Sequence, residues 1–148
     1  MRLPKLLLWH IDYSMNPLNV LVVNDHRTEN STLSDLLQGA GHRVAVVDSC
    51  AAAIQSVTTN HFDIILCDLV LPDGEGCDLL PKLLMIRSLK AIAVMAYERE
   101  EDQARVKSAG FIDCITKPVS TDKLFKMLDE LASKGEQFPF AANESGRN

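Results

Sequence analysis

The feature that most constrains the fold is an apolar run without polar alternation, Ile64-Ile65-Leu66, inside residues 62–68. A run of this kind suits a strand that is covered on both faces, as in a parallel sheet, whereas a half-exposed strand alternates apolar and polar side chains. The run ends on a carboxylate, Asp68, and a turn-rich segment follows at residues 72–76. Because the ligands of parallel sheets bind beyond the carboxyl ends of the strands, we expect Asp68 to lie at a functional edge.

Apolar runs like this one alternate with segments of helical spacing along the chain. The predicted strands cover residues 19–24, 43–48, 62–68, 91–95 and 111–116, and the predicted helices cover 27–40, 50–60, 77–88, 99–109 and 121–134. The alternation and the short links predict one α/β domain, a doubly wound five-stranded parallel sheet with right-handed crossovers and helices on both faces. The expected organisation is an N-terminal arm at residues 1–17, the domain at 18–134, and a disordered tail at 135–148.

Length, charge and cysteine content narrow the class of protein. A chain of 148 residues suits a single domain, and a net charge of -5 argues against a nucleic-acid-binding surface, which would carry a basic patch. The apolar run in the arm is interrupted by His10 and Asp12, and it is shorter than the roughly 20 residues that span a bilayer. That length argues against a membrane partner. The 4 cysteines form no C-x-x-C pair, which favours free thiols in the reducing cytoplasm.

Two strand ends are expected to form one site. In a sheet of order 2-1-3-4-5 the first and third strands are neighbours, so Asp25 and Asp68 would face the same crevice. Mg²⁺ relieves the repulsion between two such carboxylates, since it binds one or two of them together with waters and phosphate oxygens. Lys117, at the end of the fifth strand, can bring a positive charge for a phosphoryl group. A cis bond is predicted before Pro118 in the turn that follows.

These residues carry a resemblance to the receiver domains of two-component response regulators, which have a flavodoxin-like fold. The matching motifs, in the order and spacing of the family, are VLVVND, DIILCDLVLPDGEG, AYEREEDQARVKSAG and ITKP. The resemblance covers residues 18–134 and implies a signalling domain rather than a turnover enzyme. It also implies that a histidine kinase or a phosphotransfer protein is the partner that donates the phosphoryl group.

The resemblance assigns a role to each matching residue. Asp68 would be the phosphoacceptor, and Lys117 would pair with the phosphoryl oxygens. Asp25, Asp68 and the backbone carbonyl of Val70 would bind Mg²⁺ directly. The family usually has a second acid where this chain has Asn24, which can reach the metal only through a water molecule. A weakened affinity for Mg²⁺ is therefore expected.

Both positions of the usual conformational switch also depart from the family. Met95 stands where the family has a Ser or Thr that hydrogen-bonds the phosphoryl group, and Cys114 stands where it has an aromatic residue. A thioether donates no hydrogen bond, and a bond to a charged group contributes about 1.5–3 kcal/mol. The alternative is therefore a pseudo-receiver that acts as a phosphorylation-independent interaction module. In either case, output is expected through the face formed by residues 99–109, 111–116 and 121–134, which could also support a homodimer.

Three further features have simpler interpretations. Asp73, in a Pro-Asp-Gly sequence, is interpreted as a turn residue. His26 is interpreted as a solvent-facing loop residue, although it follows the acidic site. The charged residues at 99–102 are interpreted as a solvated helix face.

Overall fold

The computed structural model describes residues 17–96 and 99–133. The elements in chain order are β1 (Asn19–Val23), α2 (Arg27–Gly39), β2 (Arg43–Val47), α3 (Cys50–Thr59), β3 (Ile64–Asp68), β4 (Val70–Leu71), β5 (Gly74–Glu75), α4 (Gly76–Ile86), β6 (Lys90–Met95), α5 (Glu100–Ala109), β7 (Asp113–Thr116) and α6 (Thr121–Ser133). The predicted arm and tail lie outside the described residues, except for Pro17.

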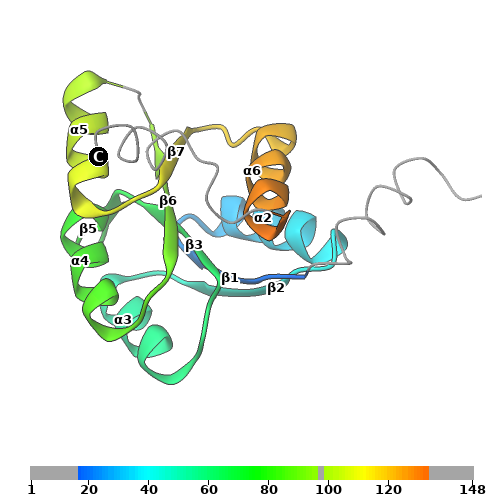
Figure 1. The fold of residues 1–148 in the computed structure, drawn as a ribbon, viewed down its shortest axis with the longest axis horizontal. Coiled ribbons are helices and arrows are strands. Elements are labelled where there is room, and N and C mark those ends of the chain that lie inside the picture. Colours follow the sequence, from blue (N-terminus) through cyan, green and yellow to red (C-terminus); the bar gives the residue numbers. More distant parts are fainter. Residues whose placement is uncertain (1–16, 97–98, 134–148) are drawn as a thin grey trace, which may run out of the picture.

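The large sheet has five strands in the order β2-β1-β3-β6-β7, and all four pairings are parallel. This is the predicted order 2-1-3-4-5, because β6 and β7 are the fourth and fifth strands once the small hairpin of β4 and β5 is set aside. Figure 1 shows α2 and α6 on one face of the sheet and α3, α4 and α5 on the other. The sequence-based fold class is therefore confirmed.

The core explains why the central strand lacks polar alternation. All five residues of β3 are buried. Ile65 and Cys67 pack into the cluster under α3, α4 and α5, whereas Ile64 and Leu66 pack into the cluster under α2 and α6. Full burial of one such aliphatic side chain contributes about 1.5–3 kcal/mol, so a strand with two apolar faces is specified strongly for the middle of this sheet.

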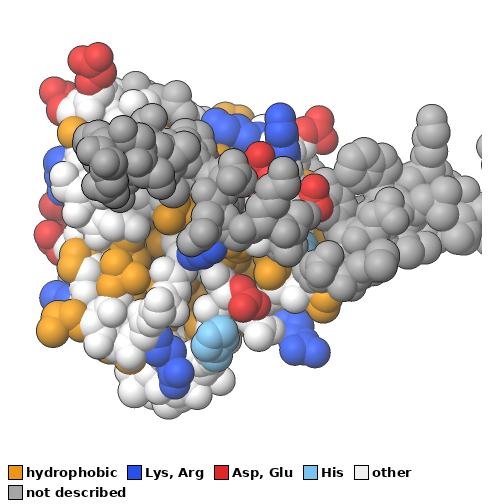
Figure 2. All heavy atoms as spheres, in the orientation of Figure 1, with side chains coloured by type: hydrophobic (Ala, Val, Ile, Leu, Met, Phe, Trp, Pro, Cys, Tyr) orange, Lys and Arg blue, Asp and Glu red, His pale blue; other side chains and the backbone are white. Residues whose placement is uncertain are grey.

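Two helices begin with a serine whose hydroxyl accepts a backbone hydrogen bond. The Ser49 hydroxyl accepts a hydrogen bond from Ala52 N at 3.1 Å, which makes it the N-cap of α3. The Ser120 hydroxyl accepts one from Lys123 N at 3.4 Å at the start of α6. The first turn of α5 carries the acidic residues that complement a helix amino terminus. Figure 2 shows acidic side chains exposed over this end of α5, which agrees with a solvated face at residues 99–102.

A short antiparallel hairpin, β4 and β5, follows Asp68 where only a loop was predicted. Asp73 lies in its turn, as expected, but its carboxylate also accepts hydrogen bonds from Cys50 N at 2.7 Å and Ala51 N at 3.1 Å. These bonds hold the pKa of Asp73 below its ordinary value. The turn of the hairpin is thus fixed to the amino terminus of α3.

The end of the hairpin requires a glycine. A Cβ atom on Gly76 would lie 2.6 Å from the carbonyl oxygen of Asp68 and 3.2 Å from the Cα atom of Leu69. Both neighbours are backbone atoms, so they cannot move aside without shifting the strand end that carries Asp68. The close approach of α4 to β3 therefore depends on a residue without a side chain.

No helix among residues 17–96 and 99–133 is long and apolar enough to span a membrane.

We predict that Gly76→Ala lowers the free energy of unfolding by about 1–3 kcal/mol, as expected for a forced overlap in a packed region. The measurement is urea denaturation followed by circular dichroism. Gly39→Ala is the matched control, because a Cβ atom there meets nothing within 4 Å, and it should be neutral or stabilising by up to about 1 kcal/mol. Equal stability of Gly76→Ala and the wild type would contradict the close approach.

A second prediction concerns His42, which is buried. Its Nδ1 accepts a hydrogen bond from Leu18 N at 3.1 Å, and its Nε2 has no partner among the described residues. Burial lowers the pKa of His42 below 6.5. The unfolded chain therefore binds a proton first as the pH falls below about 6.5. Stability should decrease from there until the pH passes the folded pKa.

Urea denaturation at pH 7.5, 6.5 and 5.5 tests this dependence. His42→Gln should lose less stability between the two extremes than the wild type does, because glutamine binds no proton in either state. His61→Gln, which changes an exposed histidine, should keep the wild-type dependence. Parallel curves for the wild type and His42→Gln would show that His42 does not contribute.

Candidate functional site

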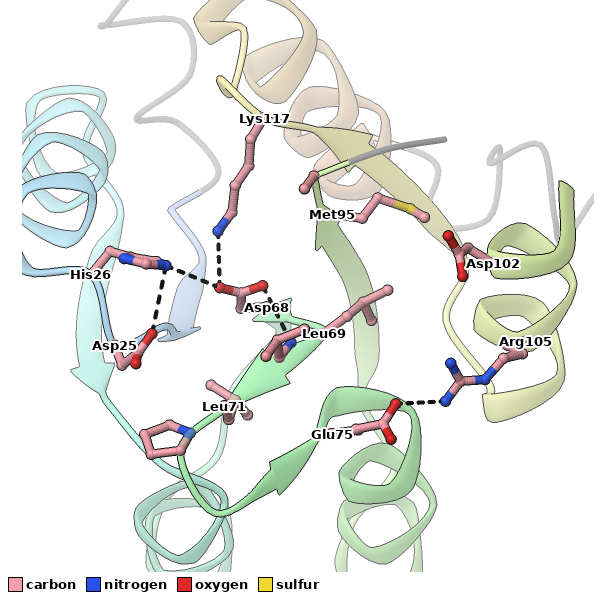
Figure 3. A pocket seen from close by; sticks show the side chains of 13 residues that line it. Asp25, His26, Asp68, Leu69, Leu71, Glu75, Met95, Asp102, Arg105 and Lys117 are labelled. Carbon is pink, nitrogen blue, oxygen red and sulfur yellow. Dashed lines mark hydrogen bonds and ion pairs between the residues drawn. The ribbon is translucent and has the colours of Figure 1, made fainter. Parts of the chain in front are cut away.

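A pocket of about 560 Å³ opens at the carboxyl edge of the large sheet. Figure 3 shows the side chains around it, with Asp68 between Asp25 and His26 on one side and Lys117 above. The lining residues are Asp25, His26, Asp68, Leu69, Val70, Leu71, Pro72, Glu75, Met95, Ala96, Asp102, Arg105 and Lys117. The pocket thus lies where the sequence predicted a site, and the structure brings Asp25, Asp68 and Lys117 together in it.

Asp68 is the buried carboxylate of the pocket, with a side chain that is only 7% exposed. Its Oδ2 accepts a hydrogen bond from Lys117 Nζ at 2.9 Å, and its Oδ1 accepts one from Val70 N at 3.4 Å. Lys117 is itself fixed at the end of β7, since its backbone N–H donates to Met95 O at 2.8 Å. The Lys117–Pro118 peptide bond is cis. A buried negative charge is therefore paired with a cation.

Val70 presents its backbone polar groups to the site. In the β4–β5 hairpin, Gly76 N donates to Leu69 O at 2.9 Å, so Leu69 and Gly76 form a hydrogen-bonded pair. Hydrogen-bonded and non-bonded pairs alternate in an antiparallel ladder, so the next pair, Val70 and Glu75, has no ladder bonds. The N–H and C=O of Val70 consequently point away from β5, and the N–H binds the Asp68 carboxylate.

His26 lies closer to the acids than its interpretation as a solvent-facing loop residue implied. Its side chain is 57% exposed, but Nε2 lies 3.7 Å from Asp25 Oδ1 and 4.0 Å from Asp68 Oδ2. Figure 3 shows the ring directed toward both carboxylates. In the sequence, the only signal for this placement was the position of His26 directly after Asp25.

Asn24 is buried, and its side chain is bound inside the protein. Its Nδ2 donates to Glu29 Oε1 at 2.9 Å, and its Oδ1 accepts from His26 N at 3.2 Å. Its backbone oxygen also accepts from Asn30 Nδ2 at 2.6 Å. Asn24 therefore fixes the loop between β1 and α2, and its contact with a metal-bound water stays a prediction.

Glu29 is an acid of the site that the sequence did not reveal. It lies in the first turn of α2, and its Oε1 is 3.6 Å from Lys117 Nζ. Partial burial raises the pKa of Glu29. The hydrogen bond from Asn24 and the charges of Lys117 and His26 together lower it by more, so the net pKa lies below the ordinary value. The first turn of α2 thus brings a second carboxylate beside Lys117.

The other wall of the pocket is apolar at its base and charged at its rim. Met95 lines the pocket, whereas Cys114 lies deeper, and both belong to the buried core cluster under α3, α4 and α5. At the rim, Arg105 Nη2 donates to Glu75 Oε1 at 2.7 Å and connects α5 to the hairpin. The sequence did not indicate this ion pair, because Glu75 and Arg105 are 30 residues apart.

The cysteines do not supply a reactive thiolate near the pocket. None of the 4 forms a disulfide, as predicted, although Cys50 and Cys77 are only half-buried. Burial, with a smaller contribution from Asp73, raises the pKa of Cys50 to about 11. Burial also raises the pKa of Cys67, which precedes Asp68. Since the thiolate is the nucleophile, a carboxylate is the better candidate for covalent chemistry here.

Comparison with known proteins agrees with this geometry. The transcriptional regulatory protein ZraR of Klebsiella oxytoca is 29% identical over 114 residues, which cover 76% of this chain and 26% of ZraR. The sensor histidine kinase RcsC of Escherichia coli K12 is 28% identical over 116 residues, covering 78% of this chain and 12% of RcsC. The chain therefore spans only a fraction of the length of these relatives.

Solved structures show the same fold. A response regulator receiver domain protein (CheY-like) from Methanospirillum hungatei JF-1 has a TM-score of 0.76 at 26% identity, over 82% of this chain and 98% of that one. A two-component response regulator from Clostridium difficile also has a TM-score of 0.76, at 18% identity, over 78% of this chain and 96% of that one. The family model of the response regulator receiver domain matches residues 20–129. The chain therefore belongs to the response regulator receiver domain family.

Proposed function

We propose that this domain accepts a phosphoryl group from a phosphohistidine onto Asp68. The observation that carries the proposal is the ion pair between Asp68 Oδ2 and Lys117 Nζ at 2.9 Å, in a pocket that Asp25 shares. A carboxylate oxygen of Asp68 would attack phosphorus, forming an O–P bond while the N–P bond of the donor breaks and its electron pair returns to the imidazole. Lys117 would then offset the charge of the phosphoryl oxygens.

The donor set of the pocket fits Mg²⁺, which prefers oxygen ligands. Asp25, Asp68 and the backbone carbonyl of Val70 would hold it, and the direction of the Val70 C=O away from β5 supports this assignment. When bound, the ion offsets the negative charge that gathers on the phosphoryl oxygens. Asn24 contributes no charge and already binds Glu29 and the backbone of His26, so a weakened affinity is expected.

Receiver domains act in two-component signalling, and a histidine kinase or phosphotransfer protein in the cytoplasm is the proposed partner of this one. The proposed output surface consists of α5, β7 and α6, through which partner or homodimer contacts would change. Acidic first-turn residues of α5 lie on this surface, which supports a protein partner rather than a nucleic acid.

A second candidate is a pseudo-receiver that binds partners without phosphorylation. The observation that favours it is the burial of Met95 and Cys114 in the core. Met95 cannot donate a hydrogen bond to a phosphoryl group as a hydroxyl would, and Cys114 has no aromatic ring to change orientation in response. The two candidates share the fold and the surface, and they differ in whether Asp68 reacts.

We predict that incubation with acetyl phosphate and Mg²⁺ adds one phosphoryl group, about 80 Da by covalent chemistry, to the intact wild-type protein. Asp68→Asn should show no gain, because an amide oxygen is not a competent nucleophile. Asp48→Asn is the matched control, since Asp48 follows the neighbouring strand β2 and is exposed, and it should react as the wild type does. A wild type that gains no mass would leave the pseudo-receiver as the function.

We further predict that Met95→Thr increases the structural response to phosphorylation. A hydroxyl there restores a hydrogen bond of about 1.5–3 kcal/mol to the charged group, equivalent to roughly 10- to 100-fold in the bias between states. Amide chemical-shift changes on acetyl phosphate should be confined to the pocket in the wild type and extend along β7 and α6 in the variant.

Met95→Leu is the control for the switch, because it changes the shape of the side chain without adding a donor. It should respond as the wild type does. A response of the wild type that already extends through β7 and α6 would show that this chain switches without the hydroxyl.

A further inference from the structure

The pocket brings a nitrogen ligand into a group of oxygen ligands. Asp25, His26 and Asp68 each offer one metal-ligating atom, and these atoms all lie within 4.8 Å of one another. The two acids come from the ends of neighbouring strands, whereas His26 comes from the loop before α2. Figure 3 shows the three side chains converging on the same side of the pocket. A mixed set of one imidazole and two carboxylates differs chemically from an all-oxygen site.

Two of the three separations are known, and both are somewhat longer than a single ion requires. Two ligand atoms that each lie about 2.1 Å from one ion are about 3.4 Å apart at the tetrahedral angle. His26 Nε2 lies 3.7 Å from Asp25 Oδ1 and 4.0 Å from Asp68 Oδ2. The His26 and Asp25 side chains are 57% and 38% exposed, so small side-chain rotations can close the remaining gap while Asp68 stays in place.

The backbone of His26 is fixed, and its ring is not engaged in capping the helix. Its N–H donates to Asn24 Oδ1 at 3.2 Å, and its carbonyl accepts from Asn30 N at 2.9 Å. His26 stands at the N-cap position of α2, but its side chain makes no capping hydrogen bond. Asn24 therefore adds no charge to the site, but it positions His26, the residue that supplies the nitrogen ligand.

If a metal ion binds Asp68 Oδ2, Lys117 can pair with Glu29 instead. Its Nζ lies 2.9 Å from Asp68 Oδ2 and 3.6 Å from Glu29 Oε1. A small rotation toward Glu29 keeps the ammonium paired while it releases that oxygen. Glu29 thus reduces the competition between Lys117 and a metal ion for the Asp68 carboxylate.

We infer that His26 is a metal ligand and that it shifts the selectivity of this pocket from Mg²⁺ toward borderline transition-metal ions such as Zn²⁺ and Co²⁺. Imidazole nitrogen suits these ions, whereas Mg²⁺ requires oxygen ligands. Asn24 adds no negative charge to the pocket, and Mg²⁺ depends strongly on charged oxygen ligands. The inference concerns the metal of the proposed phosphoacceptor site, and it is tested by binding alone.

The experiment titrates the unphosphorylated protein, without an affinity tag, with Co²⁺ and separately with Mg²⁺. Co²⁺ is followed by its visible absorption and by hyperfine-shifted imidazole proton signals, and Mg²⁺ by calorimetry. His26→Ala should lower the Co²⁺ affinity by at least about tenfold, since loss of even an outer partner of a ligand costs that much. The Mg²⁺ affinity should stay within about twofold.

Two further variants sharpen the test. His26→Glu replaces nitrogen with a carboxylate, so it should raise the Mg²⁺ affinity and abolish the shifted imidazole signals. His61→Ala removes an exposed histidine on the loop before β3 and should leave both affinities unchanged. The inference is overturned if His26→Ala lowers both affinities equally, if it lowers neither, or if the Co²⁺ protein shows no shifted imidazole signal.

These outcomes are separate from the test of phosphorylation. A protein that gains a phosphoryl group while His26→Ala leaves Co²⁺ binding unchanged keeps the proposed function and loses this inference. A protein that binds Co²⁺ through His26 but gains no phosphoryl group keeps the metal site and loses the phosphoacceptor role.

Discussion

The burial of one carboxylate at the end of the central strand governs the arrangement of the pocket. Asp68 is placed by β3, which is buried along its whole length, so its charge is removed from water. An unpaired charge in that position would be strongly destabilising. Lys117 supplies the opposite charge from β7, and the backbone N–H of Val70 supplies a hydrogen bond. The single carboxylate of Asp68 therefore holds both the end of β7, 49 residues away in sequence, and the start of the hairpin that follows β3.

The pairing of charges extends beyond these two residues. Lys117 also approaches Glu29, which binds Asn24, and Asn24 in turn binds the backbone of His26. The ammonium group of Lys117 thus connects the end of β7 to the first turn of α2, and Asn24 connects that turn to the loop before it. Asn24 can join both parts of this network because its amide group both donates and accepts a hydrogen bond.

The sequence predicted the fold because its signals are local and repeated. Apolar runs such as residues 64–66 specify buried strands, and the segments of helical spacing between such runs specify the helices. It also predicted that Asp25, Asp68 and Lys117 would meet, since the order of the strands places their carboxyl ends together. Those inferences depend on backbone topology, because the order of the strands decides which carboxyl ends are neighbours.

The contacts that the sequence did not predict depend on side-chain direction. Glu29 and His26 enter the site because of the rotation of α2 and the path of its preceding loop. The β4–β5 hairpin forms from two-residue strands that are too short to produce a periodic pattern. Asp73 was assigned to a turn correctly, yet its bonds to α3 join residues more than 20 positions apart. No local pattern encodes such pairings.

The ion pair between Arg105 and Glu75 has a consequence for the rim of the pocket. Both side chains are more than half exposed, so their attraction weakens as mobile ions gather around them, within a screening length of about 8 Å at physiological ionic strength. Asp68 and Lys117, which are 7% and 18% exposed, are shielded from those ions to a much greater degree. A rise in ionic strength therefore weakens the ion pair between α5 and the hairpin. It changes the attraction between Asp68 and Lys117 at the base of the pocket much less.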